Sequence, residues 1–327
     1  DTFTVVLDAE PASDVVLSVS SGDTGEATVH GSTTSNTTLT FTSANWDTPQ
    51  SFTVTGVDDN LIDGSVSTAL NVEVVQAVSD DNFDAVADQT VSVSTTDDDV
   101  AGFTIAETDG STSVAETGTT DTFTVVLDAQ PDSDVVFIIA SNDTGEATVT
   151  SALTFTNANW NTPQTVTVTG VDDDIIDGTI TTTIDIAIND GASDNNFDPL
   201  SPQSVSAATT DDDVAGFTIA ETDGSTSVAE SGTTDTFTVV LDAEPDSDVV
   251  LTITSADTGE ATVTSTLTFT SANWDTPQTV TVTGVDDDII DGTVTSTLTI
   301  AVDDSNSDND FDSVANQTVS AATTDDD

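Results

Sequence analysis

The stretch DTFTVVLDA occupies residues 235–243, and two further copies of it stand earlier in the chain. Phe237, Val239 and Leu241 alternate in it with threonine or valine. Successive side chains of a β-strand point to opposite faces, so this period of two predicts a strand with one buried face and one exposed face. Threonine suits the exposed face because its branched Cβ favours extended backbone.

The chain of 327 residues repeats one long unit. Copies of DTFTVVLDA start at Asp1, Asp121 and Asp235, copies of NW(D/N)TPQ at Asn45, Asn159 and Asn273, and copies of TTDDD at Thr95, Thr209 and Thr323. The resulting period of 114 residues is too long for a solenoid repeat and is typical of a domain. We therefore predict three domains, at residues 1–99, 100–213 and 214–327.

Unit one differs from the other two units. It has no counterpart of VAGFTIAETDGSTSVAE, and it carries six extra residues between Val29 and Leu39. Residues 97–129 and 211–243, in contrast, differ only by threonine or serine at one position. This near-identity indicates recent duplication, and we expect the chain to be a section of a longer array.

Alternation of apolar residues with threonine continues through each unit. In unit three it predicts strands at residues 215–220 with 225–230, 235–243, 248–256, 261–270, 278–286, 293–303 and 317–324. No segment combines helical spacing with helix caps. Seven short alternating strands in about 100 residues are typical of an antiparallel β-sandwich. The predicted fold class is all-β, with tandem antiparallel β-sandwich domains arranged as a rod.

The charge balance is one-sided. The chain has 61 Asp and Glu residues, no Lys or Arg, and a formal net charge of −61, whereas an average chain of this length carries roughly 40 basic residues. Nucleic acid and anionic membranes both attract positive charge, so neither is an expected partner. The sequence has no apolar run of 18 residues, so membrane insertion is not expected. The natural counter-charge is a dissolved cation.

The residue types also limit the chemistry. No Cys is present, which excludes disulfides and thiolate metal sites. His30 is the only His, so units two and three cannot contain a Ser-His-Asp triad of their own. A pair of carboxylates is the signature of a glycosidase, but these acids recur in every unit and no domain predicts a cleft. We expect no enzymatic activity.

Acidic residues fall where several strands end together. In an antiparallel sandwich every second connection lies at the same end. The lower pole of a unit is the end at which the chain leaves the last strand. In unit three the lower pole collects Glu230, Asp257, Asp286, Asp287, Asp288, Asp291, Asp325, Asp326 and Asp327. Two carboxylates 4 Å apart repel by about 1 kcal/mol even in water, so this convergence needs a cation.

Calcium is the cation that this residue set favours. Ca²⁺ takes six to eight oxygen ligands, many of them carboxylates, whereas Mg²⁺ usually keeps several waters. The number of acids exceeds the needs of one ion, so we expect several Ca²⁺ ions, at the lower pole of each repeat and at the joints. The alternative is a solvated acidic surface, as in halophilic proteins.

The opposite end, which we call the upper pole, is acidic as well. In unit three it carries LDAEPDSD and DDSNSDNDFD. The run DDDVAGF leaves almost no linker between units, so the lower pole of one unit should meet the upper pole of the next. We expect calcium to make this joint rigid. For the upper-pole acids, calcium binding and simple solvation are equally open.

These motifs resemble a Calx-beta domain, and more closely the Calx-beta-like tandem repeats of large secreted bacterial adhesins and surface fibres. The resemblance rests on LTFTSANWDTPQTVTVTGVDDD, the acidic loop that follows it and the final strand that ends in DDD. It covers essentially all of each complete unit and implies calcium binding through a glutamate, an aspartate after the third strand, the acidic loop and the triple Asp.

The resemblance assigns ligands position by position. In unit three it selects Glu230, Asp257, Asp286, Asp287, Asp291 and Asp325 to Asp327, and in unit two Glu116, Asp143, Asp172, Asp173, Asp177, Asp211, Asp212 and Asp213. Asp174 matches Asp288, and the acids of unit one are Asp23, Asp58, Asp59, Asp63, Asp97, Asp98 and Asp99. Unit one has Asn60 where the others have Asp, and it has no matching glutamate. The loop acid is Asp177 or Asp291 rather than the longer Glu of the family.

The function we predict is structural: a calcium-rigidified extracellular stalk or filament segment at a cell surface, with neighbouring repeats and further copies of the chain as partners. The alternatives are a module that binds a glycan or surface, and a calcium sensor. Trp46, Trp160 and Trp274 would serve a glycan site, but the sequence favours them as plugs of the sandwich. Asn36, Asn142 and Asn316 lie in N-x-S/T sequons.

Overall fold

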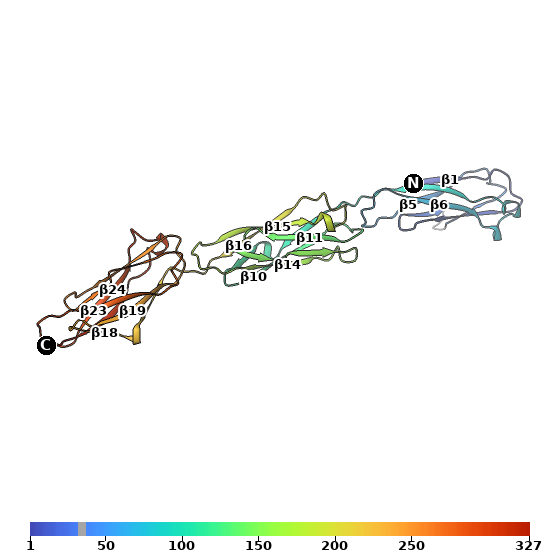
Figure 1. Cartoon of the computed structure of the whole chain (residues 1–327). Coiled ribbons are helices and arrows are strands. Elements are labelled where there is room, and N and C mark those ends of the chain that lie inside the picture. The colour runs from blue at the N-terminus through green and yellow to red at the C-terminus, as the bar shows by residue number, and fades with distance from the viewer. Residues whose placement is uncertain (32–36) are drawn as a thin grey trace.

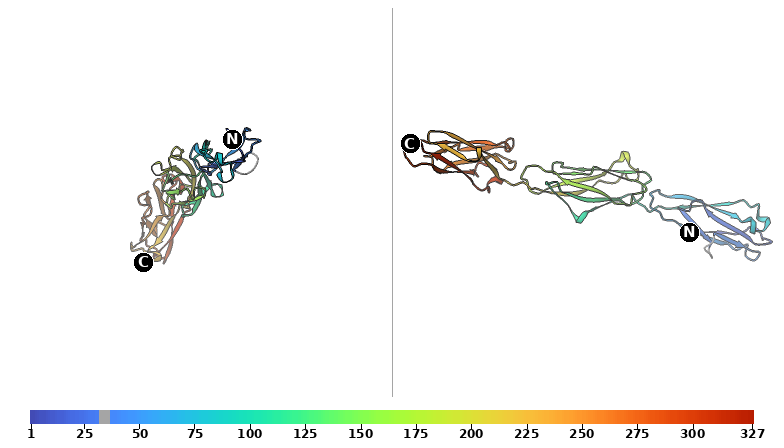
Figure 2. Two further views of the ribbon diagram at one scale, coloured as in Figure 1. Left: turned by 90° about the vertical axis from the view of Figure 1, so that its right-hand side faces the viewer. Right: turned by 90° about the horizontal axis from the view of Figure 1, so that it is seen from below.

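The computed structural model describes residues 1–31 and 37–327. Three β-sandwiches follow one another end to end and form an elongated, gently bent chain (Figure 1), and a view along the chain shows that they are not exactly coaxial (Figure 2). The predicted fold class is confirmed. Among the described residues, no helical segment is long and apolar enough to cross a membrane.

Unit two contains nine strands in two sheets. They are β8 (Phe103–Glu107), β9 (Thr112–Ala115), β10 (Thr120–Leu127), β11 (Val135–Ser141), β12 (Ala147–Val149), β13 (Ala152–Phe155), β14 (Gln164–Gly170), β15 (Ile180–Ile188) and β16 (Gln203–Thr210). One sheet has the order β12-β14-β10-β8, and the other has the order β13-β11-β15-β16-β9. Short 3₁₀ helices η3 (Thr108–Gly110) and η4 (Asp190–Ala192) lie in the connections.

Unit three repeats this arrangement. Its strands are β17 (Phe217–Glu221), β18 (Thr226–Ala229), β19 (Thr234–Leu241), β20 (Val249–Ser255), β21 (Ala261–Val263), β22 (Thr266–Phe269), β23 (Gln278–Gly284), β24 (Val294–Val302) and β25 (Gln317–Thr324), with η5 (Thr222–Gly224) and η6 (Asn309–Phe311). The sheet orders, β17-β19-β23-β21 and β18-β25-β24-β20-β22, correspond to those of unit two.

Unit one has the same layout over fewer strands. These are β1 (Thr2–Val5), β2 (Val15–Ser21), β3 (Ala27–Gly31), β4 (Thr38–Phe41), β5 (Gln50–Gly56), β6 (Val66–Val74) and β7 (Gln89–Thr95), with η1 (Gln76–Val78) and η2 (Asp81–Phe83). The sheets have the orders β1-β5-β3 and β4-β2-β6-β7. Among the described residues, nothing corresponds to β8 or β9.

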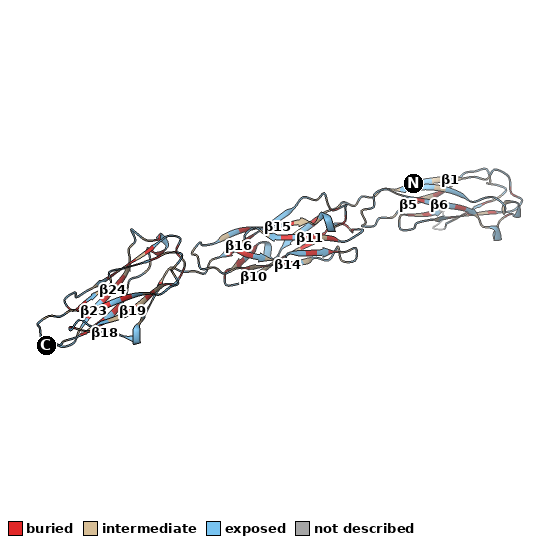
Figure 3. Cartoon of the chain, in the orientation of Figure 1, coloured by how far each residue is buried: buried red, intermediate tan, exposed pale blue. Residues whose placement is uncertain are grey.

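Alternation places the core as the sequence predicts. In β10, Phe123, Val125 and Leu127 are buried, and Phe123 faces Val166 of β14 in the antiparallel register. Buried and exposed residues therefore alternate along the strands (Figure 3). Each unit has its own apolar core, which supplies the driving force for folding a domain.

Two predicted strands are each divided between the sheets. The single strand predicted at residues 261–270 is wrong, because β21 pairs with β23 in one sheet and β22 pairs with β20 in the other. The apolar residues keep the same phase on both sides of the crossing, at Ala261, Val263, Leu267 and Phe269, and only the exposed Ser265 interrupts them. The residues between the two strands, Thr264 and Ser265, include no Gly, Pro, Asn or Asp to mark a crossing.

The first strand of each complete unit also changes sheet. β17 pairs antiparallel with β19, whereas β18 pairs parallel with β25, so the units are not purely antiparallel. The chain turns at Asp223 and Gly224, whose φ angles of 57° and 82° lie in the left-handed region. Asp tolerates this region and Gly adopts it without steric cost, which explains the Asp-Gly pair.

The joints between units are made by a loop rather than by the triple Asp alone. The loop between β5 and β6 lies on the next unit, where the backbone N–H of Gln130 donates to the carbonyl of Asn60 at 2.7 Å. In the second joint the N–H of Glu244 donates to the carbonyl of Asp174 at the same distance. Segments 96–102 and 211–216, which lie between the sheets of successive units, contain no strand.

An isoleucine from the same loop closes each joint. Ile62 packs against the core of unit two, and Ile176 packs against the core of unit three. Their counterpart in unit three, Ile290, is 81% exposed. The joint therefore buries apolar surface in addition to its backbone hydrogen bond.

The substitution Ile176→Asp should loosen the joint between units two and three, because it places a charge against an apolar core. Small-angle X-ray scattering is expected to show a broader range of end-to-end distances than in the unchanged chain. Ile290→Asp, at the matching exposed position, is the control and should leave the scattering unchanged. Equal scattering from both variants would show that the isoleucine does not hold the joint.

Candidate metal centre

The lower pole of unit two gathers acids from four connections. Glu116 follows β9, Glu146 precedes β12, Asp177 lies between β14 and β15, and Asp211 and Asp213 follow β16. These strands end at the same pole because of the sandwich topology. The predicted convergence of separate segments is thus present in the structure.

The acids of this pole form two groups that share one glutamate. Glu116, Asp211 and Asp213 make the first group, and Glu116, Glu146 and Asp177 make the second, each with ligand oxygens within 4.8 Å of one another. Two oxygens on the same Ca²⁺ lie at most about 5 Å apart, since each Ca–O distance is about 2.3–2.6 Å. The spacing therefore fits two ions that share Glu116.

Unit three has the same pair of groups. One group consists of Glu230, Glu260 and Asp291. The other consists of Glu230, Asp325 and Asp327, so Glu230 belongs to both. The recurrence is expected from the near-identical sequences, and it places equivalent side chains in equivalent positions. Both complete units therefore present the same two-group arrangement.

The shared glutamates are buried with unpaired oxygens. Glu116 and Glu230 are each 1% exposed. Among the described residues, neither carboxylate oxygen of Glu116 has a hydrogen-bond partner, and one oxygen each of Glu146, Glu230 and Glu260 has none. Burying an ionised carboxylate without partners is costly, so such a group needs either a proton or a cation. With no Lys or Arg in the chain, the cation must come from solution.

The pKa values reflect this environment. Burial, and then the nearby negative charge of Asp211, raises the pKa of Glu116 to about 7. The backbone N–H of Asp212 acts in the opposite direction, although it is too far or too poorly aligned to form a hydrogen bond with Glu116. Burial and Asp211 likewise raise the pKa of Asp213 to about 6. The pKa values of Glu146, Glu230 and Glu260 are also raised, in each case first by burial. In all five carboxyl groups the pKa is raised because the charged form is removed from water and lies close to other negative charges.

Other aspartates of the lower pole hold the loops in shape. Asp211 Oδ2 accepts the backbone N–H of Gly178 at 2.8 Å, and its Oδ1 accepts that of Asp213 at 2.7 Å. Asp173 accepts the N–H of Ile175 at 2.8 Å. The matching bonds from Gly64 and Gly292 lower the pKa of Asp97 and Asp325. The first Asp of the triple Asp thus ties the tail of a unit to its acidic loop before any ion is considered.

The predicted ligands divide into two sets. The groups with metal-compatible spacing contain Asp58, Asp98, Asp99, Glu116, Asp177, Asp211, Asp213, Glu230, Asp291, Asp325 and Asp327. Outside them lie Asp23, Asp59, Asp63, Asp97, Asp143, Asp172, Asp173, Asp174, Asp212, Asp257, Asp286, Asp287, Asp288 and Asp326. That any of these residues binds calcium stays a prediction.

One ligand candidate in each complete unit, Glu146 and Glu260, was not predicted from the sequence. Asp143 is exposed, and its Oδ1 accepts the backbone N–H of Gly145 at 3.0 Å, so it shapes the turn DTGE. Glu146, three residues later, is the buried side chain that reaches the other acids. An Asp-x-Gly turn followed by Glu and an apolar strand was the available signal, because such an Asp is a typical turn residue.

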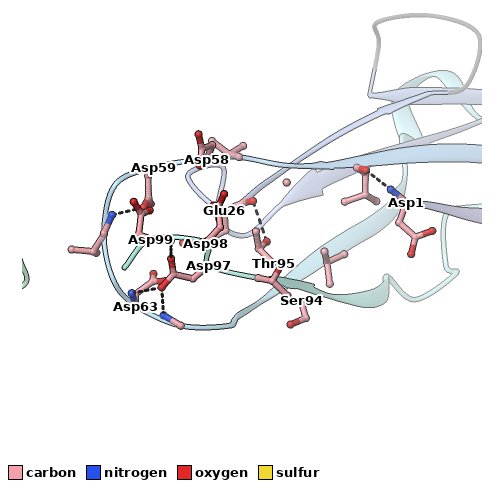
Figure 4. A pocket seen from close by; sticks show the side chains of 17 residues that line it. Asp1, Glu26, Asp58, Asp59, Asp63, Ser94, Thr95, Asp97, Asp98 and Asp99 are labelled. Carbon is pink, nitrogen blue, oxygen red and sulfur yellow. Dashed lines mark hydrogen bonds between the residues drawn. The ribbon is translucent and has the colours of Figure 1, made fainter. Parts of the chain in front are cut away.

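Unit one has a more open acidic pocket. It is lined by acids that include Glu26, Asp58, Asp63, Asp98 and Asp99 (Figure 4). Asp58, Asp98 and Asp99 have the metal-compatible spacing, and two of them are exposed. Burial and then Asp63 raise the pKa of Glu26. Among the described residues of this unit, no glutamate takes the place of Glu116.

Acids of the upper pole have a structural role. Asp194 is buried; its Oδ2 accepts the backbone N–H of Ser133 at 2.9 Å and its Oδ1 accepts that of Asn196 at 2.9 Å. Asp80 and Asp308 make the matching bonds in the other units. Asp80, Asp194 and Asp308 thus fasten one upper-pole loop to the other. Whether the upper-pole acids bind calcium stays open.

The alternative sites gain no support. Trp160 and Trp274 are partly buried and pack against the cores of their units, as a plug would. Asn142 and Asn316 are exposed, whereas Asn36 lies outside the described residues.

Comparison with known proteins gives fold-level similarity alone. No family model and no curated protein matches the sequence. Domains 4–9 of the surface layer protein SbsC are 19% identical over 94% of this chain, which spans 39% of that structure, with a TM-score of 0.29. The structure of CBD12 from CALX1.2 is 13% identical to this chain, and the match covers 60% of this chain and 79% of that structure, with a TM-score of 0.26. At these values we take no function from either protein.

The raised pKa of Glu116 predicts an unusual pH dependence. A folded-state pKa above the ordinary 4.5 means that the folded protein binds more protons than the unfolded chain between pH 4.5 and about 7. In the presence of EDTA, the contribution of Glu116 to stability should therefore fall as the pH rises through this window. Urea unfolding at a series of pH values from 4.5 to 8 measures the free energy of unfolding and therefore this decline.

Glu116→Gln should reduce this decline, whereas Glu73→Gln, at an exposed strand position, should not. Identical pH profiles for Glu116→Gln and the unchanged chain would contradict the assignment of a buried, unpaired carboxylate.

Glu146 and Asp143 offer a direct comparison. Glu146→Gln should weaken calcium binding to unit two by about tenfold or more, because it removes a charged ligand from the site. Asp143→Asn removes the same charge three residues away and retains an oxygen for the turn, so it should have little effect. Calorimetric titration with calcium of both variants distinguishes them, and a larger loss in Asp143→Asn would overturn the placement.

Proposed function

We propose that this chain is a calcium-stiffened rod of tandem β-sandwiches, acting as a structural segment at a cell surface or in an extracellular filament. The observation that carries the proposal is the pair of buried glutamates, Glu116 and Glu230, whose oxygens face further carboxylates without any basic partner. Calcium would supply the missing positive charge, with the six to eight oxygen ligands it prefers.

The acidic loop links ion binding to the joint. Asp63 of unit one lies near enough to Asp132 of unit two for that charge to raise its pKa, after burial and its neighbours Asp59 and Asp97. Asp246 of unit three has the same effect on Asp177, after burial, Asp173 and Asp211. Without cations the two units repel each other across the joint. A bound cation at the loop would remove that repulsion and hold the loop that carries Ile62 or Ile176.

An extracellular location fits this mechanism. Calcium-binding modules that work outside cells have dissociation constants of about 10⁻⁴–10⁻³ M, and they are filled by the calcium present there. A glycan-binding function would require an exposed aromatic platform, whereas Trp46, Trp160 and Trp274 are each partly buried. A sensor remains the second candidate, favoured if calcium changes the arrangement of units without stabilising them.

Thermal unfolding tests the proposal. Calcium at millimolar concentration should raise the melting temperature by roughly 10 °C relative to EDTA, since it binds the folded chain and not the unfolded one. Magnesium at the same concentration should raise it much less.

The double variant Glu116→Gln and Glu230→Gln should lose most of the calcium effect. The matched control, Asp185→Asn with Glu73→Gln, removes two exposed charges and should keep it. An equal rise with calcium and magnesium, or an unchanged rise in the glutamate variant, would mean that the acids form a solvated coat.

A further inference from the structure

One side of each complete unit is formed by two edge strands that follow one another in the chain. In unit two these are β12 and β13, each at the end of its sheet order, and in unit three they are β21 and β22. An edge strand presents unpaired backbone N–H and C=O groups, which can pair with a strand of another molecule. We call this side the β12–β13 side in unit two and the β21–β22 side in unit three.

The register shows which backbone groups of β13 point away from its sheet. β13 pairs antiparallel with β11, and the N–H of Ile139 donates to the carbonyl of Ser151 at 2.9 Å. Hydrogen-bonded and non-hydrogen-bonded pairs alternate along an antiparallel ladder. Ser151 and Leu153 therefore bond to β11, whereas the N–H and C=O groups of Ala152 and Thr154 point outward. Only these outward groups are available to a further strand.

A glutamine side chain covers one of these outward groups. Gln164, the last residue of the motif NW(D/N)TPQ, donates its side-chain N–H to the carbonyl of Thr154 at 2.7 Å. The matching bonds in the other units join Gln278 to Thr268 at 2.7 Å and Gln50 to Thr40 at 2.9 Å. The glutamine therefore occupies an acceptor that an added strand would use.

The first residue of the same motif closes the end of the edge. Asn159 Oδ1 accepts the backbone N–H of Thr156 at 2.6 Å and its hydroxyl at 3.1 Å. Asn45 and Asn273 make the matching bonds in the other units. The motif NW(D/N)TPQ thus supplies two polar side chains to the edge, and both occupy backbone groups that a further strand would need.

The same side is almost free of charge, which is unusual in so acidic a chain. Residues 147–171, from β12 through β14, contain no Asp or Glu, and residues 261–285 contain only Asp275. The neighbouring strands β11 and β20 are uncharged as well. Two molecules that each carry a net charge of −61 repel least where neither presents a charge. A second copy of the chain can therefore approach on this side at the lowest electrostatic cost.

The opposite side of the unit is capped in the same way but carries carboxylates. There Gln203 donates its side-chain N–H to the carbonyl of Phe103 in the edge strand β8 at 3.0 Å. β8 itself contains Glu107, and Asp121 accepts the backbone N–H of Ser113 in β9 at 2.8 Å. The two sides therefore share a glutamine cap and differ in charge.

We propose that the edges of β13 and β22 form a latent self-association surface for a second copy of this chain, and that Gln164 and Gln278 keep it closed. In an antiparallel pair of β13 strands centred on Leu153, Ala152 lies opposite Thr154 of the second copy, and each such pair exchanges two hydrogen bonds. The glutamine removes the carbonyl of Thr154 from this pairing, so copies of the chain stay apart along their sides. This inference goes beyond the proposed structural role and does not depend on calcium.

The test compares two double variants of the whole chain by sedimentation velocity over a range of concentrations in EDTA. Gln164→Ala with Gln278→Ala opens the uncharged edges and should raise the self-association constant about tenfold or more above that of the unchanged chain. Gln203→Ala with Gln317→Ala removes the matching caps from the charged edges and should leave association unchanged. Thermal unfolding of both variants confirms that they are folded. Equal association of the first variant and the unchanged chain, or equal gains in both variants, would overturn the proposal.

Further substitutions in the first variant locate the contact on the edge. Thr154→Pro with Thr268→Pro removes outward N–H groups and leaves the bonds to β11 and β20 in place, so association should return to that of the unchanged chain. Thr154→Asp with Thr268→Asp places charges at the same exposed positions and should have the same effect, which gives a second readout if the proline variant does not fold. Association that persists in the aspartate variant would place the contact elsewhere, and the proposal would be wrong.

Discussion

Negative charge without an internal counter-charge is the constraint on which this structure depends. With 61 acidic residues and no Lys or Arg, no carboxylate outside the reach of His30 or the amino terminus can be neutralised by a side chain of the same chain. Most acids avoid the problem by staying exposed. Glu116 and Glu230 do not, since they are buried beside other acids, and their placement makes sense only with a bound cation or a proton.

The chain uses aspartate in three physically different ways. Asp143 and Asp173 accept nearby backbone N–H groups and shape turns. Asp194 and Asp211 tie one loop to another through backbone N–H groups far away in sequence. Asp177 and Asp213 each lie in a group of metal-compatible spacing with the shared glutamate Glu116. The first two uses pre-organise the loops so that the third set converges.

The sequence predicted the fold class and most strands because alternation with period two survives in every unit. It predicted the convergence of acids at one pole because that follows from strand order alone. It did not predict the division of residues 261–270 between two sheets, since both halves face one core and keep the same apolar phase on either side of Ser265. Glu146 was missed although a signal for it was present: Asp143 is the turn residue of DTGE, which leaves Glu146 as the acid that points inward.

The joint was predicted only in outline. The sequence indicated that two acidic poles meet. In the sequence Ile176 is simply an apolar residue within an acidic loop, and no pattern indicates that it contacts the next unit. Its contact with the next core appears only once both units are placed.

The most direct measurement of the central claim is the number of calcium ions bound per chain, by equilibrium dialysis at neutral pH. Four groups in units two and three have the required spacing, and the described part of unit one adds one more, so we predict at least four tightly bound ions that magnesium does not displace at equal concentration. Replacement of Glu116 by Gln should remove two of them together, because that side chain is shared. Weak binding in proportion to calcium concentration, without saturation, would show that the carboxylates attract a diffuse cloud of counterions and hold no ion in place.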